Sequence, residues 1–132
     1  MREVKLPSGA VLKIGVNPFE TSKALYQAML EEMKGLPITS KEEVGNFYKN
    51  LLCISFSSKK IEVALWECFK KCQYCDVRGE LKIDKDTFEP LEARADYVQV
   101  CMEVARENVD PFGNGLYAQY QMLLEKVAQS QL

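Results

Sequence analysis

The chain has 132 residues, of which 47% are hydrophobic and 27% charged, and its formal net charge is −2. This length and composition predict one globular domain, residues 1–132, with a hydrophobic core of its own. The sequence contains no histidine, which excludes Ser-His-Asp and Cys-His catalysis and removes the commonest metal ligand, so we expect a binding protein and not an enzyme.

Residues 3–16 predict an N-terminal β-hairpin. Apolar and polar residues alternate on both sides of Pro7-Ser8-Gly9, a segment suited to a tight turn. An isolated two-stranded ribbon is only marginally stable in water. We therefore expect this hairpin to pack against a helix or to pair with another strand.

A helical body is predicted over residues 18–129. The first helix follows Asn17, a good capping residue, and Pro18, which suits the first helical position. A second helix begins at Ser40, where Ser40-Lys41-Glu42-Glu43 forms a capping box. A third follows Ser57-Ser58, and its apolar stripe is Ile61, Ala64, Leu65, Cys68, Phe69 and Cys72.

The helical periodicity is lost after this third helix. Residues 73–83 predict a second short hairpin, with Gln73–Cys75 and Glu80–Ile83 flanking the turn Asp76–Gly79. A fourth helix begins at Pro90, and a fifth covers roughly residues 114–129. The predicted fold class is thus α+β and mainly α: an N-terminal hairpin followed by about five helices.

The cysteines suggest metal or redox chemistry. Cys68, Cys72 and Cys75 have a spacing at which thiolates can hold zinc or an iron–sulfur cluster, and Cys72 and Cys75 form a Cys-x-x-Cys pair. However, Cys68 and Cys72 also lie on the predicted apolar stripe, where cysteine behaves as a small hydrophobic residue. We predict core packing, with no metal and no cofactor.

The acidic segment after the second hairpin resembles the start of a calcium loop. Asp84-Lys85-Asp86 supplies the first carboxylates of such a loop. The glycine required at the sixth position is Glu89, and the twelfth position is Ala95. The sequence therefore does not predict a calcium site here.

Aromatic residues beside two apolar stripes are candidates for a partner surface, because aromatic side chains anchor protein interfaces. Trp66 lies next to the stripe of the third helix and Tyr117 next to that of the fifth. The alternative is that both belong to a wider core face. The candidate residues for partner binding or self-association are Trp66, Leu116, Tyr117, Tyr120, Leu123 and Leu124.

Nucleic acid and membrane are not expected as partners. The only basic doublets are Lys59-Lys60 and Lys70-Lys71, whereas phosphate binding needs a clustered basic surface. No apolar run reaches the length of about 18–20 residues that spans a bilayer, and the charged N-terminus does not resemble a signal peptide. We expect a cytoplasmic protein with reduced cysteines.

Six sequence blocks, taken in order, resemble the tail assembly chaperones of long-tailed, siphovirus-type bacteriophages and prophages. The blocks are Lys5–Ala10, Val16–Glu20, Lys23–Tyr26, Ala64–Cys68, Asp86–Tyr97 and Val104–Phe112. The likeness covers nearly the whole chain. It lies in the joint order of the blocks, because each block by itself is a structural motif and not a catalytic one.

The resemblance implies a non-catalytic role in virion assembly. Such chaperones coat the long tape measure protein in the bacterial cytoplasm before the tail tube polymerises around it, and they are absent from the mature virion. The implied partners are the tape measure protein, the tail tube protein and further copies of the chain. The alternatives are a tail-completion or connector protein of the virion and a small regulator that binds metal through its cysteines. A third, which the sequence supports least, is an enzyme that uses carboxylates.

Overall fold

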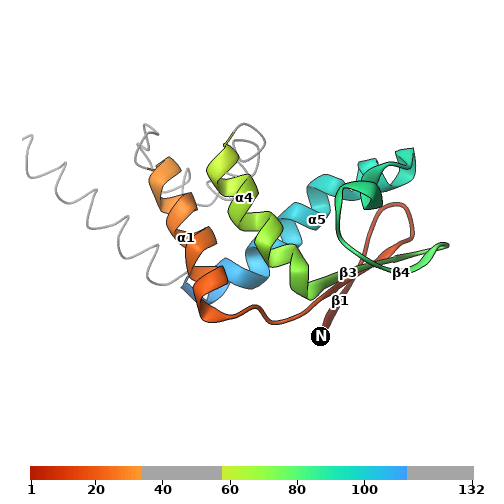
Figure 1. The fold of residues 1–132 in the computed structure, drawn as a ribbon. Coiled ribbons are helices and arrows are strands. Elements are labelled where there is room, and N and C mark those ends of the chain that lie inside the picture. The colour runs from red at the N-terminus through yellow and green to blue at the C-terminus, as the bar shows by residue number, and fades with distance from the viewer. Residues whose placement is uncertain (34–57, 113–132) are drawn as a thin grey trace, which may run out of the picture.

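The computed structural model describes residues 1–33 and 58–112. Within them the chain forms an α+β fold (Figure 1). Its elements are β1 (Arg2–Lys5), β2 (Val11–Ile14), α1 (Phe19–Met33), α4 (Lys59–Cys68), β3 (Cys72–Asp76), β4 (Gly79–Lys82) and α5 (Leu91–Val109), with short 3-10 turns at Phe69–Lys71, Lys85–Phe88 and Asp110–Phe112. The helices predicted from Ser40 and over residues 114–129 lie outside the described residues.

The two predicted hairpins are confirmed, but they form a single sheet. The strand order is β1-β2-β3-β4 and every neighbouring pair is antiparallel. The predicted α+β class is confirmed, but the predicted arrangement, an N-terminal hairpin followed by a helical body over residues 18–129 with a short second hairpin near residues 73–83, was wrong because it did not join the two hairpins. The physical reason is that the first hairpin gains a partner strand: Leu12 lies opposite Tyr74, and Ile14 opposite Cys72.

Two glycines allow the hairpin turns. Gly9 has φ of 95° and Gly79 has φ of 108°, a region that other residues adopt at a steric cost. In the first turn the Leu6 N–H donates to the Ala10 carbonyl at 2.8 Å, and the Gly9 N–H donates to the Leu6 carbonyl at 3.0 Å. Pro7-Ser8-Gly9 thus forms the turn that its composition predicts.

Helix α4 begins as predicted and ends earlier than predicted. The Ser58 side chain accepts a hydrogen bond from the Ile61 N–H, so Ser58 is the N-cap. The helix ends at Cys68, and Cys72 is the first residue of β3, so its placement on the helical stripe was wrong. Gly15 permits this exit: its N–H donates to the Lys71 carbonyl at 2.9 Å, and a Cβ at Gly15 would lie 2.5 Å from that oxygen.

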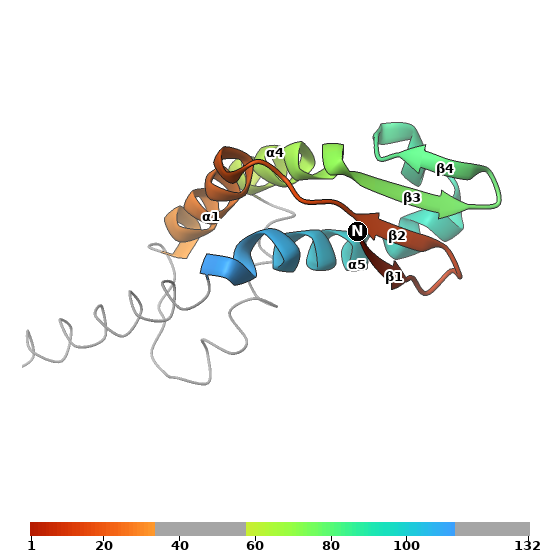
Figure 2. The ribbon, with the colours of Figure 1, turned by 90° about the horizontal axis from the view of Figure 1, so that it is seen from below.

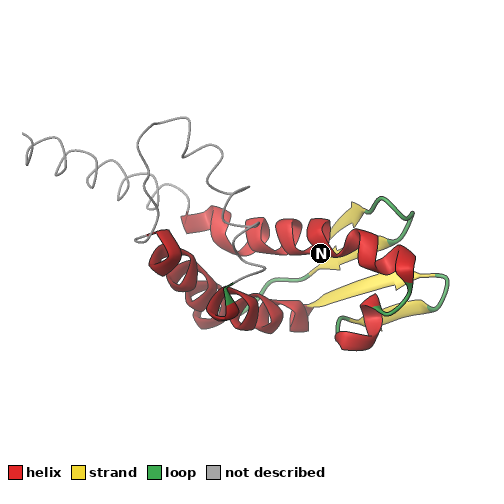
Figure 3. Cartoon of the chain, turned by 90° about the horizontal axis from the view of Figure 1, so that it is seen from above, coloured by secondary structure: helices red, strands yellow, loops and turns green. Residues whose placement is uncertain are grey.

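Helix α5 joins the two ends of the molecule. Helices α1 and α4 lie side by side at one end and the strands lie at the other, while α5 runs along both (Figures 2 and 3). The largest fully buried side chains include Leu25 of α1, Leu12 and Tyr74 of the sheet, and Val100 and Val104 of α5. None of the described helices is long and apolar enough to cross a membrane.

Candidate functional site

The buried carboxylate of Asp96 joins three separate elements. Asp96 is 0% exposed on α5. One carboxylate oxygen accepts the Ser8 backbone N–H at 3.0 Å, and the other accepts the hydroxyls of Ser8 and Tyr74. Tyr74 comes from β3 and Ser8 from the β1–β2 turn. Three donors satisfy the buried charge, which otherwise would be costly to remove from water.

Tyr74 is a hydrogen-bond donor in this cluster. Burial raises the pKa of its hydroxyl to about 12, and the hydrogen bond to Asp96 acts in the same direction. The phenol therefore stays neutral near pH 7 and donates to the carboxylate at 2.7 Å. A Tyr that holds its proton this firmly is unsuited to the role of general base.

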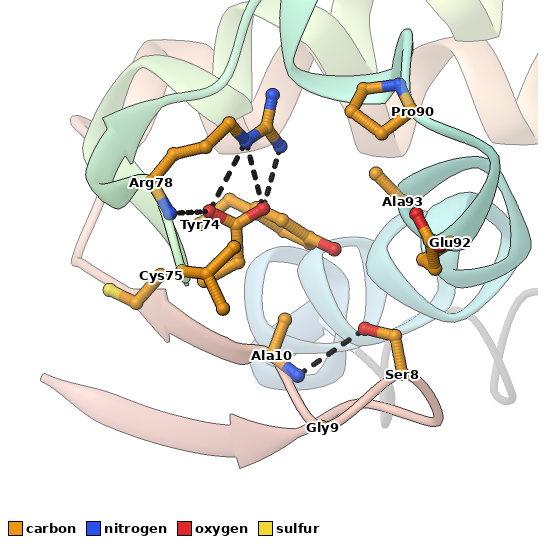
Figure 4. Close-up of a pocket in the computed structure, with 11 residues that line it drawn as sticks. Ser8, Gly9, Ala10, Tyr74, Cys75, Arg78, Pro90, Glu92 and Ala93 are labelled. Carbon is orange, nitrogen blue, oxygen red and sulfur yellow. Dashed lines mark hydrogen bonds and ion pairs between the residues drawn. The ribbon is translucent and has the colours of Figure 1, made fainter.

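A pocket of about 710 Å³ opens beside this cluster (Figure 4). Its walls come from the two hairpin turns, the end of β3 and the first turn of α5. The apolar part is formed mainly by Ala10, Tyr74, Pro90 and Ala93. Its volume lies within the usual range for small-ligand sites, which is about 300–1,000 Å³.

The charged groups of the pocket include a paired acid and base. Asp76 and Arg78 form an ion pair at 2.7 Å, and Glu92 lies across the pocket (Figure 4). Hydrogen bonds from Arg78 hold the pKa of Asp76 below its usual value, because they stabilise the ionised carboxylate. Arg78 also donates to the Thr87 carbonyl at 3.0 Å. The guanidinium is therefore held by two groups of its own chain.

A second cluster of polar contacts lies at the helical end of the molecule. We call this cluster and the Asp96 cluster the two polar joints. The Asn17 side-chain amide donates to the Cys68 carbonyl at 3.1 Å and to the Asn108 side-chain oxygen at 3.0 Å. The Ser22 hydroxyl donates to the same Asn108 oxygen at 2.7 Å, and Asn108 donates to the Val104 carbonyl at 2.8 Å. Asn17, which we expected to cap the first helix, instead uses its amide to connect α1, α4 and α5.

Trp66 lies within an aromatic cluster between α4 and α5. Its ring centroid is 5.0 Å from that of Phe69 and 6.3 Å from those of Phe88 and Tyr97, and its indole N–H donates to the Tyr97 hydroxyl at 3.2 Å. The side chain is half-buried and packs against the core. The other predicted contact residues, Leu116, Tyr117, Tyr120, Leu123 and Leu124, lie outside the described residues.

The cysteines of the described segments are mainly core residues. Cys68, Cys72 and Cys101 are buried, and burial raises their pKa values to about 12, 11 and 12. Cys75 is half-buried on the opposite face of β3. Within residues 1–33 and 58–112, no three Cys, Asp or Glu side chains form a group that could hold a metal ion. Cys53 lies outside these residues.

In the segment that resembles the start of a calcium loop, Asp84 and Thr87 bond to the backbone of their own turn. The Asp84 carboxylate accepts the N–H groups of Asp86 and Thr87, and the Thr87 hydroxyl accepts the Asp84 N–H at 3.0 Å. This is a capping box for the 3-10 turn Lys85–Phe88. The carboxylate is thus used to begin a turn.

The sequence reasoning missed the two polar joints. Asp96 and Asn108 both lie in the predicted fourth helix, at helical spacing from apolar residues: Asp96 follows Ala93 by three residues, and Asn108 follows Val104 by four. A polar residue at such a spacing signals a buried polar contact. That signal was present, but it does not identify the partners.

No protein-family model matches the chain, and no curated protein or solved structure matches it.

Proposed function

We propose that this chain is a tail assembly chaperone of a long-tailed bacteriophage or prophage. It binds and coats the tape measure protein in the host cytoplasm before the tail tube polymerises, and it performs no catalysis. Coating requires many moderate and reversible contacts along one long partner, and multivalency supplies the avidity. Contacts with the tail tube protein and self-association belong to the same proposal.

The observation that supports this proposal most is how five of the six resembling blocks meet in space. Ser8, in the first block, bonds to Asp96 in the fifth. Asn17, in the second block, bonds to Cys68 in the fourth and Asn108 in the last. Blocks far apart in sequence thus form the two polar joints of one fold. A chain that shared its fold with these chaperones would keep the blocks in this order.

The chemistry of the polar groups favours a binding role over a catalytic one. The Asp96 carboxylate is enclosed by three hydrogen bonds, and the Tyr74 hydroxyl keeps its proton at neutral pH. The buried thiols have raised pKa values, so they are poor nucleophiles. These groups stabilise the fold, and the surface is left for partner contacts.

Co-expression tests the proposal directly. The tape measure protein has a long apolar helical surface that aggregates when uncovered. Co-expressed with this chain, it should stay in the soluble fraction and co-purify with it. The variant Leu123→Glu, in the proposed contact set, should reduce co-purification, whereas Leu91→Glu, at a position that is 76% exposed on α5, serves as the matched control. A tape measure protein that remains insoluble with the wild-type chain contradicts the proposal.

Two further measurements separate the alternatives. A tail-completion or connector protein would be present in purified virions, whereas a chaperone would be absent from them. A cysteine-based metal regulator would contain stoichiometric zinc or iron by elemental analysis of the purified protein. Virion retention or bound metal would each replace the chaperone proposal with a different function.

A further inference from the structure

Strand β1 is an outer strand of the sheet, and within the described residues its outer edge has no partner strand. The Leu6 N–H donates to the Ala10 carbonyl. Because hydrogen bonding alternates along an antiparallel pair, the backbone groups of Arg2 and Val4 also face β2. The N–H and C=O groups of Glu3 and Lys5 therefore point away from the sheet.

At the opposite edge, the last residue of strand β4 is hydrogen-bonded to its own chain. The Thr87 hydroxyl donates to the Lys82 backbone carbonyl at 3.0 Å, and Thr87 is only 2% exposed. Arg78 fixes this turn by donating to the Thr87 carbonyl. This bond occupies one backbone acceptor at the end of β4, and capping an edge strand in this way partly protects a sheet. Within residues 1–33 and 58–112 the two edges are thus unequal, because no such bond occupies the outer edge of β1.

We propose that β1 pairs with β1 of a second copy of this chain, antiparallel and about a two-fold axis at Val4. In this register Glu3 of each copy lies opposite Lys5 of the other, and the two Val4 residues face each other. The outward-pointing N–H and C=O groups of Glu3 in each copy bond to those of Lys5 in the other, so four backbone hydrogen bonds form. The pairing is isologous, as closed dimer interfaces are.

The charges of β1 select this register. In such a pairing, the inner faces of the two sheets lie on the same side only if the two-fold axis passes through a residue of β1. An axis between two residues would place inner-face side chains opposite outer-face ones. An axis at Glu3 would place the two Glu3 side chains opposite each other, and an axis at Lys5 would do the same for the two lysines. Like charges directly opposite are destabilising, whereas opposite charges stabilise a sheet. An axis at Lys5 would also oppose Glu3 with Pro7, which has no N–H.

The inner face of the sheet suits the same pairing. Val4 is half-buried beside Leu12, its partner on β2, and it packs against the core. Arg2, on the same face, bonds to Glu103 and Glu107 of α5, so the strand is held against its own helix. This inference specifies the self-association that is part of the proposed function, and in that respect it rests on it. The sedimentation experiment below tests the pairing of β1 alone, whereas co-expression with the tape measure protein tests the chaperone function.

Charge reversal on β1 tests the proposal. In sedimentation velocity over a wide concentration range, we expect the wild-type chain to dimerise, and Glu3→Lys or Lys5→Glu to weaken the dimer at least about tenfold. Mixing the two single variants should restore a dimer, because each lysine then faces a glutamate. The double variant Glu3→Lys with Lys5→Glu should dimerise like the wild type.

Two more variants separate this interface from others. Lys5→Pro removes an outward-pointing N–H but no bond to β2, so it should abolish the dimer while circular dichroism stays unchanged. Lys82→Glu, on the β4 edge, should leave the dimer intact. A wild-type chain that stays monomeric at millimolar concentration overturns the proposal. So does a mixture of single variants that fails to dimerise, or a dimer weakened by Lys82→Glu, which would indicate pairing of β1 with β4.

Discussion

Ser8 and Asp96 are 88 positions apart in the sequence, yet Ser8 donates both its backbone N–H and its hydroxyl to the Asp96 carboxylate. This contact ties the turn of the first hairpin to helix α5. Because Asp96 is fully buried, the carboxylate depends on these donors and on Tyr74 to replace the water it has lost. The contact is therefore a point at which the whole fold can be tested.

Replacing Asp96 should destabilise the protein more than replacing an exposed residue of the same helix. Asp96→Ala leaves the Tyr74 hydroxyl and two Ser8 donors without their acceptor, and we expect a loss of about 3 kcal/mol in the free energy of unfolding. Asp96→Asn keeps the shape and one acceptor oxygen, so it should cost less. Urea unfolding followed by circular dichroism measures both. Glu92→Gln, exposed on the same helix, should stay within about 0.5 kcal/mol of the wild type.

Asn108 should be energetically coupled to Asn17. Asn108→Ala removes the acceptor of two hydrogen bonds at a site that is 5% exposed, and we expect a loss of about 2 kcal/mol in unfolding free energy. Asn17→Ala should cost about 1 kcal/mol. The double variant should lose less than the sum of the two, because both single variants break the same bond. Strict additivity would show that this bond contributes nothing.

Trp66 can be assigned to core or interface by one substitution. Its rings and indole N–H contact Phe69, Phe88 and Tyr97. If Trp66 is core, Trp66→Ala lowers the unfolding free energy by about 3 kcal/mol. Val63→Ala, on the exposed side of the same helix, is the control and should change little. Unchanged stability together with weaker partner binding would assign Trp66 to an interface instead.

The cysteines should differ in reactivity under native conditions. Cys75 is half-buried, whereas Cys68, Cys72 and Cys101 are buried with raised pKa values and hold few thiolates near pH 7. In a Cys53→Ser background, brief treatment with iodoacetamide should modify Cys75 first. Tandem mass spectrometry locates the modified residue. Equal labelling of Cys72 and Cys75 in the folded protein would be inconsistent with this placement, and urea should expose all four thiols.

Local patterns predicted the elements well where the physics is local. Pro7-Ser8-Gly9 predicted the first turn, and Ser58 predicted a helix N-terminus, because turns and caps depend on neighbouring backbone groups. Cys72 shows the limit of such patterns. Its spacing continues the helical stripe. However, the Gly15 N–H bonds to the Lys71 carbonyl, and the chain enters strand β3 at the next residue. A contact 56 positions away decided the end of the helix.

The sequence by itself determined two hairpins, the described helices and a composition without histidine, since these follow from residue type and spacing. Only the tertiary structure decided that both hairpins share one sheet and that Asp96 and Asn108 are buried joints. It also decided that the end of β4 is bonded to its own chain, because the turn Lys85–Phe88 brings the Thr87 hydroxyl to the Lys82 carbonyl. Pairing between distant segments depends on the packing of the whole core, which no local spacing encodes.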